Sequence, residues 1–131
     1  MNGALATLGP LLGRVLLSAV FFYSGWNKFA AVGRTASSIA GRGIPQATAM
    51  AYASAAFELA ASILVALGLR ARLCSAAVIL YLALVTYLFH WHPALHGDHA
   101  QMVQLLKNAG LAGGFLLLAT YGPGPVSIDR R

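Results

Sequence analysis

The chain has 131 residues, of which 59% are hydrophobic and 9% are charged, and its mean hydropathy is +0.72. Soluble domains carry about 25% charged residues, so this composition cannot supply the polar surface that a soluble enzyme needs. The net charge of +6 does not indicate nucleic-acid binding, because the basic residues are scattered singly among apolar runs. We therefore expect an integral membrane protein with one transmembrane domain over residues 1–131.

Four apolar segments follow one another along the chain, at about residues 8–29, 47–68, 73–92 and 101–121. Each is about 20 residues long, which is the length of a helix that crosses a hydrocarbon core of about 30 Å. The apolar residues do not alternate with polar ones at period two, as they would in a β-barrel. The sequence thus predicts an all-α fold, an integral membrane four-helix transmembrane bundle.

The connections between these segments differ in length. Residues 68–72 form a tight turn and residues 93–100 a short connection, whereas residues 30–46 are the longest and contain three glycines. Glycine interrupts regular structure, so the middle of the longest connection, residues 35–40, is open to two interpretations, a loop or a short interfacial helix.

Lysine and arginine predict the orientation, because they are enriched in cytoplasmic loops. One side of the predicted bundle carries five basic residues and the other carries three: Arg14, Arg70, Arg72, Arg130 and Arg131 against Lys28, Arg34 and Arg42. We therefore expect both termini and the tight turn to be cytoplasmic. Arg14 lies within the first segment, and we expect its long side chain to extend to the cytoplasmic headgroups.

Glu58 lies about halfway along the second apolar segment, where an ionisable side chain is costly and usually has a partner inside the bundle. The basic candidates in the same half of the bundle are Lys28 and Lys107. His90 and Asn108 belong to that half as well. Two interpretations remain open: an ion pair that holds helices together, and a polar pocket, open to the outside, for a ligand.

The ligand interpretation rests on the excess of positive charge, two lysines against one glutamate, which suits a quinone carbonyl or a small anion. The candidate ligand-binding residues are Lys28, Glu58, His90, Lys107 and Asn108, with Phe22, Trp26 and Tyr87 as candidate ring contacts. No catalytic residue is assigned.

The sequence contains few residues that could bind a metal or carry out thiol chemistry. His92, His96 and His99 are metal-ligand candidates, but with His90 their spacing matches no zinc signature, and we expect no metal. Cys74 is the single cysteine, which excludes an internal disulfide. No haem or iron–sulfur ligand set is present, so no intrinsic cofactor is expected.

The chain resembles the DoxX family of small four-helix membrane proteins from Gly13 to Asp129. No single stretch decides the resemblance, which rests on the order and spacing of several. The matching stretches are Ser24-Gly25-Trp26-Asn27-Lys28, Gly43-Ile44-Pro45, Glu58, Gly68 with Arg70 and Arg72, Thr86 followed by His90, Gln101-Met102, Leu106-Lys107-Asn108, Gly113-Gly114, Gly122-Pro123-Gly124 and Ser127-Ile128-Asp129.

The resemblance implies a multi-pass protein of the bacterial or archaeal inner membrane. The family is named after a subunit of a thiosulfate:quinone oxidoreductase system, and its polar positions correspond to Lys28, Glu58, His90, Lys107 and Asn108. We therefore expect a redox-linked subunit that binds a quinone-like or anionic small ligand and has no redox centre of its own. A non-catalytic assembly or scaffold protein is the alternative, and a small-solute transporter is a third.

The expected partners follow from the same interpretation. The lipid bilayer is the first, and nucleic acid is not expected. A redox partner protein and a second copy of the chain are the protein partners that the sequence leaves open.

Overall fold

The computed structural model describes residues 3–129, and its regular structure is helical throughout that range. Four helical segments are long and apolar enough to cross a membrane, Gly3–Ala30, Ala47–Leu67, Ala71–Leu95 and His99–Tyr121. The predicted all-α class is thereby confirmed. The elements in chain order are α1 (Gly3–Ala30), α2 (Val32–Ala40), α3 (Ala47–Leu67), α4 (Ala71–Val85), the π-helical η1 (Thr86–Trp91), α5 (His92–Leu95) and α6 (His99–Tyr121).

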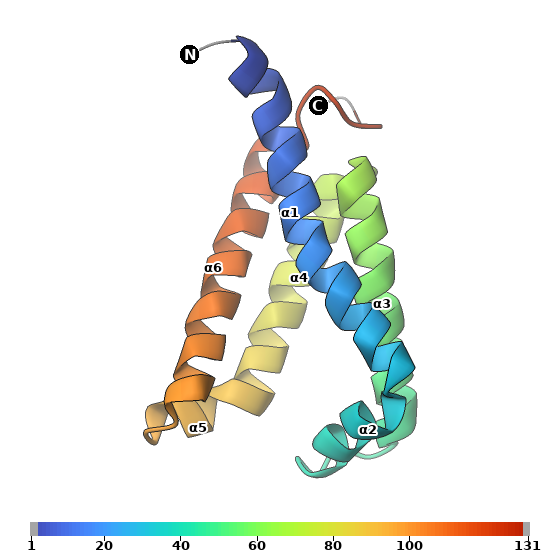
Figure 1. Ribbon diagram of the computed structural model, residues 1–131, viewed down its shortest axis with the longest axis vertical. Helices are drawn as coiled ribbons and strands as arrows, with labels where there is room; N and C mark the ends of the chain where they lie inside the picture. Colours follow the sequence, from blue (N-terminus) through green and yellow to red (C-terminus); the bar gives the residue numbers. More distant parts are fainter. Residues whose placement is uncertain (1–2, 130–131) are drawn as a thin grey trace.

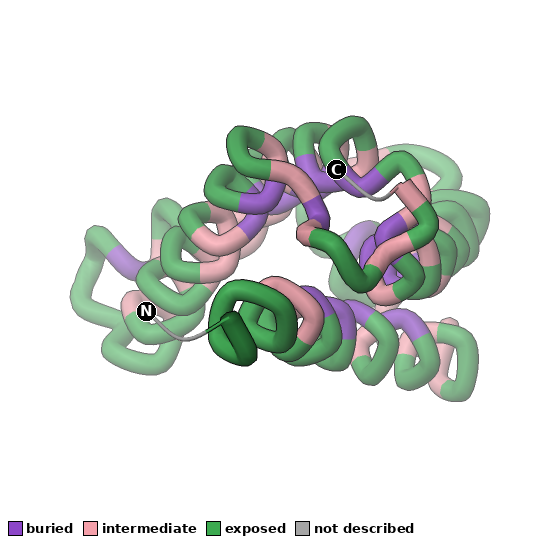
Figure 2. Tube along the Cα trace, turned by 90° about the horizontal axis from the view of Figure 1, so that it is seen from above, coloured by how far each residue is buried: buried purple, intermediate pink, exposed green. Residues whose placement is uncertain are grey.

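The bundle consists of two closely packed helix pairs, α1 with α3 and α4 with α6. The pairs approach each other at the end that holds the start of α1 and the segment after α6, and they separate toward the end that holds α2 and α5 (Figure 1). Viewed along the bundle, the buried positions lie on the faces that the helices turn toward one another (Figure 2). The apolar core lies between the helices and includes Val65, Ala71 and Leu118 toward the closed end.

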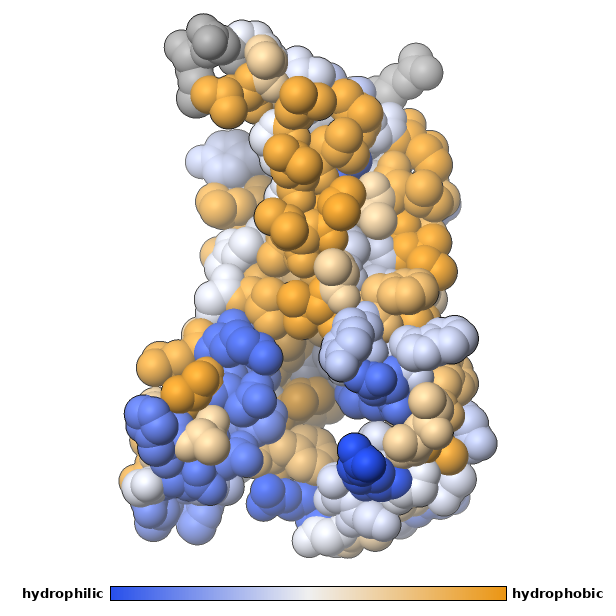
Figure 3. All heavy atoms as spheres, viewed as in Figure 1, coloured by the Kyte–Doolittle hydropathy of each residue, from blue (hydrophilic) through white to orange (hydrophobic). Residues whose placement is uncertain are grey.

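The outer faces of the long helices carry large apolar side chains. Leu16, Leu80 and Leu117 are each more than 60% exposed, as lipid-facing positions of a membrane bundle are. Figure 3 shows apolar surface over the closed end, and hydrophilic side chains on both sides of a hollow at the open end. On this face of the molecule, hydrophilic side chains thus gather at the open end.

The first span begins five residues earlier than the predicted start at residue 8, and Pro10 lies inside α1. Proline interrupts a helix because it lacks an N–H, but the loss here is confined to one hydrogen bond near the helix end. Thr7 Oγ1 donates to the Gly3 carbonyl at 2.8 Å and satisfies one acceptor of that first turn.

The third span runs beyond the predicted end at residue 92 and through Pro93. An N–H at position 93 of an α-helix would donate to the Phe89 carbonyl four residues earlier. Arg42 Nη2 donates to that carbonyl at 3.1 Å instead. The π-helical η1 ends at Trp91, two residues before Pro93; such turns occur as local insertions in α-helices. The sequence did not predict either feature.

Two shorter features agree with the sequence or refine it. The middle of the long first connection is helical, as α2, so the helical interpretation of residues 35–40 is correct. The start of α6 at His99 lies two residues before the predicted one, because the Asp98 side chain accepts a hydrogen bond from the Gln101 N–H and caps the helix.

The segment after α6 closes the bundle by hydrogen bonds to three other elements. Asp129 accepts from the N–H groups of Arg70 and Ala71 at 3.0 and 2.9 Å and so caps the start of α4. Gly68 adopts φ of +69°, and a Cβ there would lie 2.3 Å from Ser127 Cβ, so the turn before α4 requires glycine.

Arg14 does not extend to the headgroups, and that expectation was wrong. Its side chain is 2% exposed. Its two terminal nitrogens donate to the Pro123 and Val126 carbonyls, each at 2.6 Å. The reason is that the segment after α6 folds back over the closed end and presents two carbonyl oxygens to Arg14 within the protein. The guanidinium thus anchors this segment to α1.

Candidate ligand site in the open half of the bundle

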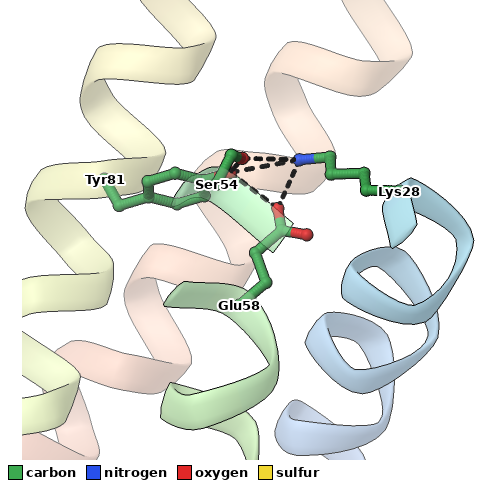
Figure 4. A network of polar contacts seen from close by, with 4 residues as sticks. All are labelled: Lys28, Ser54, Glu58 and Tyr81. Atoms are coloured by element: carbon green, nitrogen blue, oxygen red, sulfur yellow. Dashed lines mark hydrogen bonds and ion pairs between the residues drawn. The ribbon is translucent and has the colours of Figure 1, made fainter. Parts of the chain in front are cut away.

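Glu58 pairs with Lys28 at the point where α3 meets α1. Lys28 Nζ donates to Glu58 Oε1 at 2.7 Å, and the two side chains are 23% and 5% exposed (Figure 4). Of the two lysines that the sequence offered as partners, the structure therefore selects Lys28. Because both groups have little access to water, each depends on the other for compensation of its charge.

Ser54 and Tyr81 complete this network, and the sequence analysis missed both. Lys28 Nζ also donates to Ser54 Oγ and Tyr81 Oη, each at 3.1 Å, while Tyr81 Oη donates to Glu58 Oε1 at 2.7 Å. The three ammonium protons of Lys28 therefore all have acceptors. Ser54 lies four residues before Glu58, hence on the same face of α3, and this spacing was a usable signal.

A glycine allows α1 to approach α3 closely enough for the ion pair. Gly25 lies three residues before Lys28, and a Cβ at this position would lie 2.9 Å from Leu59 Cγ and 3.0 Å from the Ala55 carbonyl oxygen. Small residues at such crossings let helix backbones approach closely within a membrane. The position of Lys28 relative to Glu58 thus depends on the absence of a side chain at Gly25.

The second carboxylate oxygen of Glu58 has no partner among the described residues. Glu58 Oε2 is buried and accepts no hydrogen bond, and it points away from Ser54 and Tyr81 (Figure 4). A buried polar atom without a partner is unfavourable. This oxygen is therefore an unused acceptor in the interior of the bundle.

A cavity of about 470 Å³ lies beside this network, between α1, α4, η1 and α6, with α2 at its rim. It is large enough for a small organic molecule. All five candidate residues from the sequence line it: Lys28, Glu58, His90, Lys107 and Asn108. Helices that are distant in sequence therefore bring the predicted polar set to one cavity.

The other three candidates differ in how they are held. Asn108 Nδ2 donates to Thr86 Oγ1 at 3.0 Å, and the His90 ring is hydrogen-bonded to the Gln101 side chain. Both are thus fixed by neighbours on η1 and α6. Lys107 is exposed and forms no hydrogen bond or ion pair within residues 3–129.

The cavity carries more positive than negative charge. Arg34 lines it from α2 and was not among the predicted site residues. With Lys28 and Lys107 it makes three cations against the single carboxylate of Glu58. Such an excess, in a site partly shielded from water, favours an anionic or electron-rich ligand.

The candidate ring contacts proposed from the sequence do not line this cavity. Phe22, Trp26 and Tyr87 are 48%, 62% and 68% exposed and lie on outward faces of their helices. That expectation was wrong because proximity in sequence does not determine the face of a helix. The aromatic residues that do line the cavity are Phe21, Tyr23 and Tyr81.

The remaining histidines lie at the end of the bundle, outside the cavity. The rings of His92 and His96 stack with their centroids 4.0 Å apart, and His96 Nδ1 is 2.8 Å from the His92 carbonyl oxygen. In the part of the chain that the structure describes, His99 joins no group of three His, Cys, Asp or Glu residues able to hold a metal. This cluster is therefore not part of the candidate site.

Comparison with known proteins identifies the relatives of this fold. The DoxX family model matches residues 9–91, more than half of the chain. The chain belongs to the DoxX family. The inner membrane protein YphA of Escherichia coli (strain K12) is 31% identical over 131 residues, which cover 98% of this chain and 94% of that protein.

A second relative leads to the same assignment. The inner membrane protein YqjF of Escherichia coli (strain K12) is 29% identical over 126 residues, or 96% of this chain and 93% of that protein. No solved structure matches the chain. With its four apolar spans, the chain is a multi-pass DoxX-family protein of the inner membrane.

Proposed function

We propose that this DoxX-family protein is a redox-linked membrane subunit that binds the polar head of a quinone-like ligand in the cavity beside Glu58. One observation carries the proposal: the cavity combines unused hydrogen-bonding groups of both kinds. The exposed side chains of Arg34 and Lys107 have no partner within residues 3–129, and the buried Glu58 Oε2 lacks a donor.

A quinone head has complementary chemistry. Its carbonyl oxygens accept hydrogen bonds from cationic donors, and in the reduced form its hydroxyl groups donate to a carboxylate. Lys107 and Arg34 supply donors at the open side, and Glu58 Oε2 is an acceptor at the floor. Hydrogen bonds to charged groups contribute about 1.5–3 kcal/mol each, which is enough to orient such a head.

The source of electrons is assigned to another protein. Cys74 is the only cysteine of the chain, so thiol–disulfide exchange between two of its own residues is not available. We assign this chain the binding and orientation of the quinone, and a partner protein the donation of electrons. The orientation with both termini in the cytoplasm is part of this proposal, since it places the cavity on the outer side.

A scaffold protein is the second candidate, and one observation favours it. The Lys28–Glu58 pair joins α1 to α3 within the chain, and an ion pair can serve to specify a single packing of helices without any ligand. In that case the polar residues of the cavity would be structural, and the protein would bind no quinone.

Titration of a water-soluble quinone analogue without a prenyl tail into the solubilised protein distinguishes the two functions. We expect Lys107→Met to weaken binding about tenfold or more, equivalent to about 1.4 kcal/mol. Its stability should be unchanged, since Lys107 contacts no polar group of the described chain. Leu106→Met, which introduces the same side chain at the neighbouring lipid-facing position, should bind as the wild type does.

Two outcomes contradict the proposal. Absence of binding to folded wild-type protein leaves the scaffold function. Equal binding by Lys107→Met and wild type means that the ligand does not occupy this cavity.

A further inference from the structure

An apolar groove of about 630 Å³ lies between α1 and α6 at the closed half of the bundle. It extends along α1 from Pro10 to Leu17 and along α6 from Leu111 to Tyr121. Its one charged residue is Arg14, whose two terminal nitrogens already donate to the Pro123 and Val126 carbonyls. The other side chains that line the groove are apolar except for the Tyr121 hydroxyl.

This groove adjoins the polar cavity. Leu111 lines both, and both lie between the same two helices, with Lys107 one turn along α6 on the polar side. The two spaces thus share one lining residue and follow each other along α1 and α6, the polar one toward the open end and the apolar one toward the closed end. From Leu111 to Tyr121 the groove spans ten residues of α6, or about 15 Å, about half of a hydrocarbon core of about 30 Å.

Glycines on both helices keep the groove open. A Cβ at Gly114 would lie 2.9 Å from Leu17 Cδ2, so this position lets the helices meet at the base of the groove. Gly13 lines the groove as well, and a Cβ there would meet no atom within 4 Å. The space beside Gly13 is therefore unfilled by the protein itself.

We infer that the ligand of the polar cavity is a lipid-soluble quinone whose long apolar tail lies in this α1–α6 groove. The inference rests on the proposed function, which assigns only the head, and it adds the tail as a second element of recognition. The head lies at the open end, and the tail runs parallel to the helices toward the opposite leaflet. This is the orientation that a membrane-dissolved amphipathic molecule already has. Tail carbons that leave lipid for a fitted groove gain packing contacts.

The test compares two analogues with the same quinone head, one without a tail and one with a decyl tail. Binding is measured in nanodiscs of zwitterionic lipid, with empty discs as the correction for partition into lipid. For wild type we expect the decyl analogue to bind about tenfold or more tightly than the tailless one after this correction. The tailless analogue reports the proposed function, and the ratio of the two affinities reports this inference.

Gly13→Leu adds a side chain to the groove at a position where a Cβ meets no atom within 4 Å. We expect it to reduce the affinity ratio about tenfold and to leave binding of the tailless analogue unchanged, which also shows that the variant is folded. Leu117→Trp, on the α6 wall of the groove, is a second variant with the same expected result. Gly113→Leu is the matched control, because Gly113 is exposed, lies outside the groove and has no atom within 4 Å of an added Cβ.

The outcomes separate the two proposals. If neither analogue binds wild type, both fall. If the tailless analogue binds but the tail adds nothing, or adds as much in Gly13→Leu as in wild type, the groove is ordinary lipid contact and only this inference is overturned. The same holds if mass spectrometry of the intact particle finds a phospholipid, displaced by Gly13→Leu, in place of the decyl analogue.

Discussion

Glu58 and Lys28 place two opposite charges inside a bundle whose other faces are in contact with lipid. Removal of water from both is unfavourable, and their attraction compensates only while both are present. Lys28 has an acceptor for each of its protons, whereas Glu58 uses one oxygen for two donors and leaves the other free. All hydrogen-bond donors of Lys28 are therefore used, whereas Glu58 keeps one unused acceptor.

The first prediction concerns this pair. Glu58→Ala leaves the Lys28 ammonium without its counter-charge, and we expect it to lower the free energy of unfolding by about 3–5 kcal/mol. The double variant with Lys28→Met should lose less than the sum of the single losses, because the isolated charge is removed as well. Reversible unfolding in mixed micelles gives the free energy of unfolding of the wild type, the two single variants and the double variant.

A second cycle serves as the control. Glu58→Ala combined with Lys107→Met should lose as much stability as Glu58→Ala alone, since Lys107 forms no hydrogen bond or ion pair with Glu58 within the described residues. Additive losses in the cycle with Lys28 would show instead that the pair does not act as a unit.

At this scale the sequence was informative about which residues matter and less so about how they interact. The sequence indicated Glu58 because a carboxyl group in the middle of an apolar span is energetically unfavourable. Such a group usually has a partner or binds a ligand. The choice between Lys28 and Lys107 required the positions of α1 and α6 around α3. Tyr81 was missed because an aromatic residue in an apolar span is equally typical of lipid contact.

At the level of helices, the ion pair depends on the close packing of α1 on α3. It depends on Gly25, where a side chain would collide with the backbone of α3 as well as with Leu59. Backbone cannot give way as a flexible side chain can, so any larger residue must separate the two helices.

The second prediction follows from this contact. Gly25→Val should reduce stability by about 1–3 kcal/mol and move Lys28 away from Glu58. The Lys28–Glu58 coupling energy, measured by repeating the double-mutant cycle in this background, should then be largely lost. Gly110→Val in α6 is the control, because nothing lies within 4 Å of an added Cβ there, and a comparable loss of coupling in it would contradict the explanation.

The elements themselves were predictable where apolar length decides them. The start of α3 at Ala47 and the end of α6 at Tyr121 coincide with the predicted bounds. The end of the third span differs from its predicted bound where a tertiary partner is involved, namely Arg42 on the Phe89 carbonyl beside Pro93, together with the π-helical η1 before it. A single sequence contains no local signal for a hydrogen bond from a distant arginine.

On the scale of the whole molecule, the two ends of the bundle differ in how they are closed. One end is closed by the segment after α6, and the other is open, polar and lined by cations. The orientation in the membrane therefore matters for function, because the orientation determines the side from which polar molecules and partner proteins reach the cavity.

The third prediction is this orientation. In a Cys74→Ala background, Ser37→Cys in α2 should react with a membrane-impermeant thiol reagent in spheroplasts, and Val126→Cys after α6 should not. Both positions are exposed in the structure, so protection of Val126→Cys reflects the membrane and should disappear on permeabilisation. The opposite pattern would place the cavity on the cytoplasmic side.

The hydrogen bonds of Arg14 also constrain the order in which the protein is made. Its acceptors at Pro123 and Val126 lie 109 and 112 positions later in the chain. During synthesis α1 therefore enters the membrane long before those carbonyls exist, with a cation that no helix end or carboxylate yet neutralises. Such a group must stay near the water interface, because its burial in hydrocarbon is unfavourable. Until α6 and the segment after it have been made, Arg14 therefore lacks the two carbonyl acceptors that hold it in the finished fold.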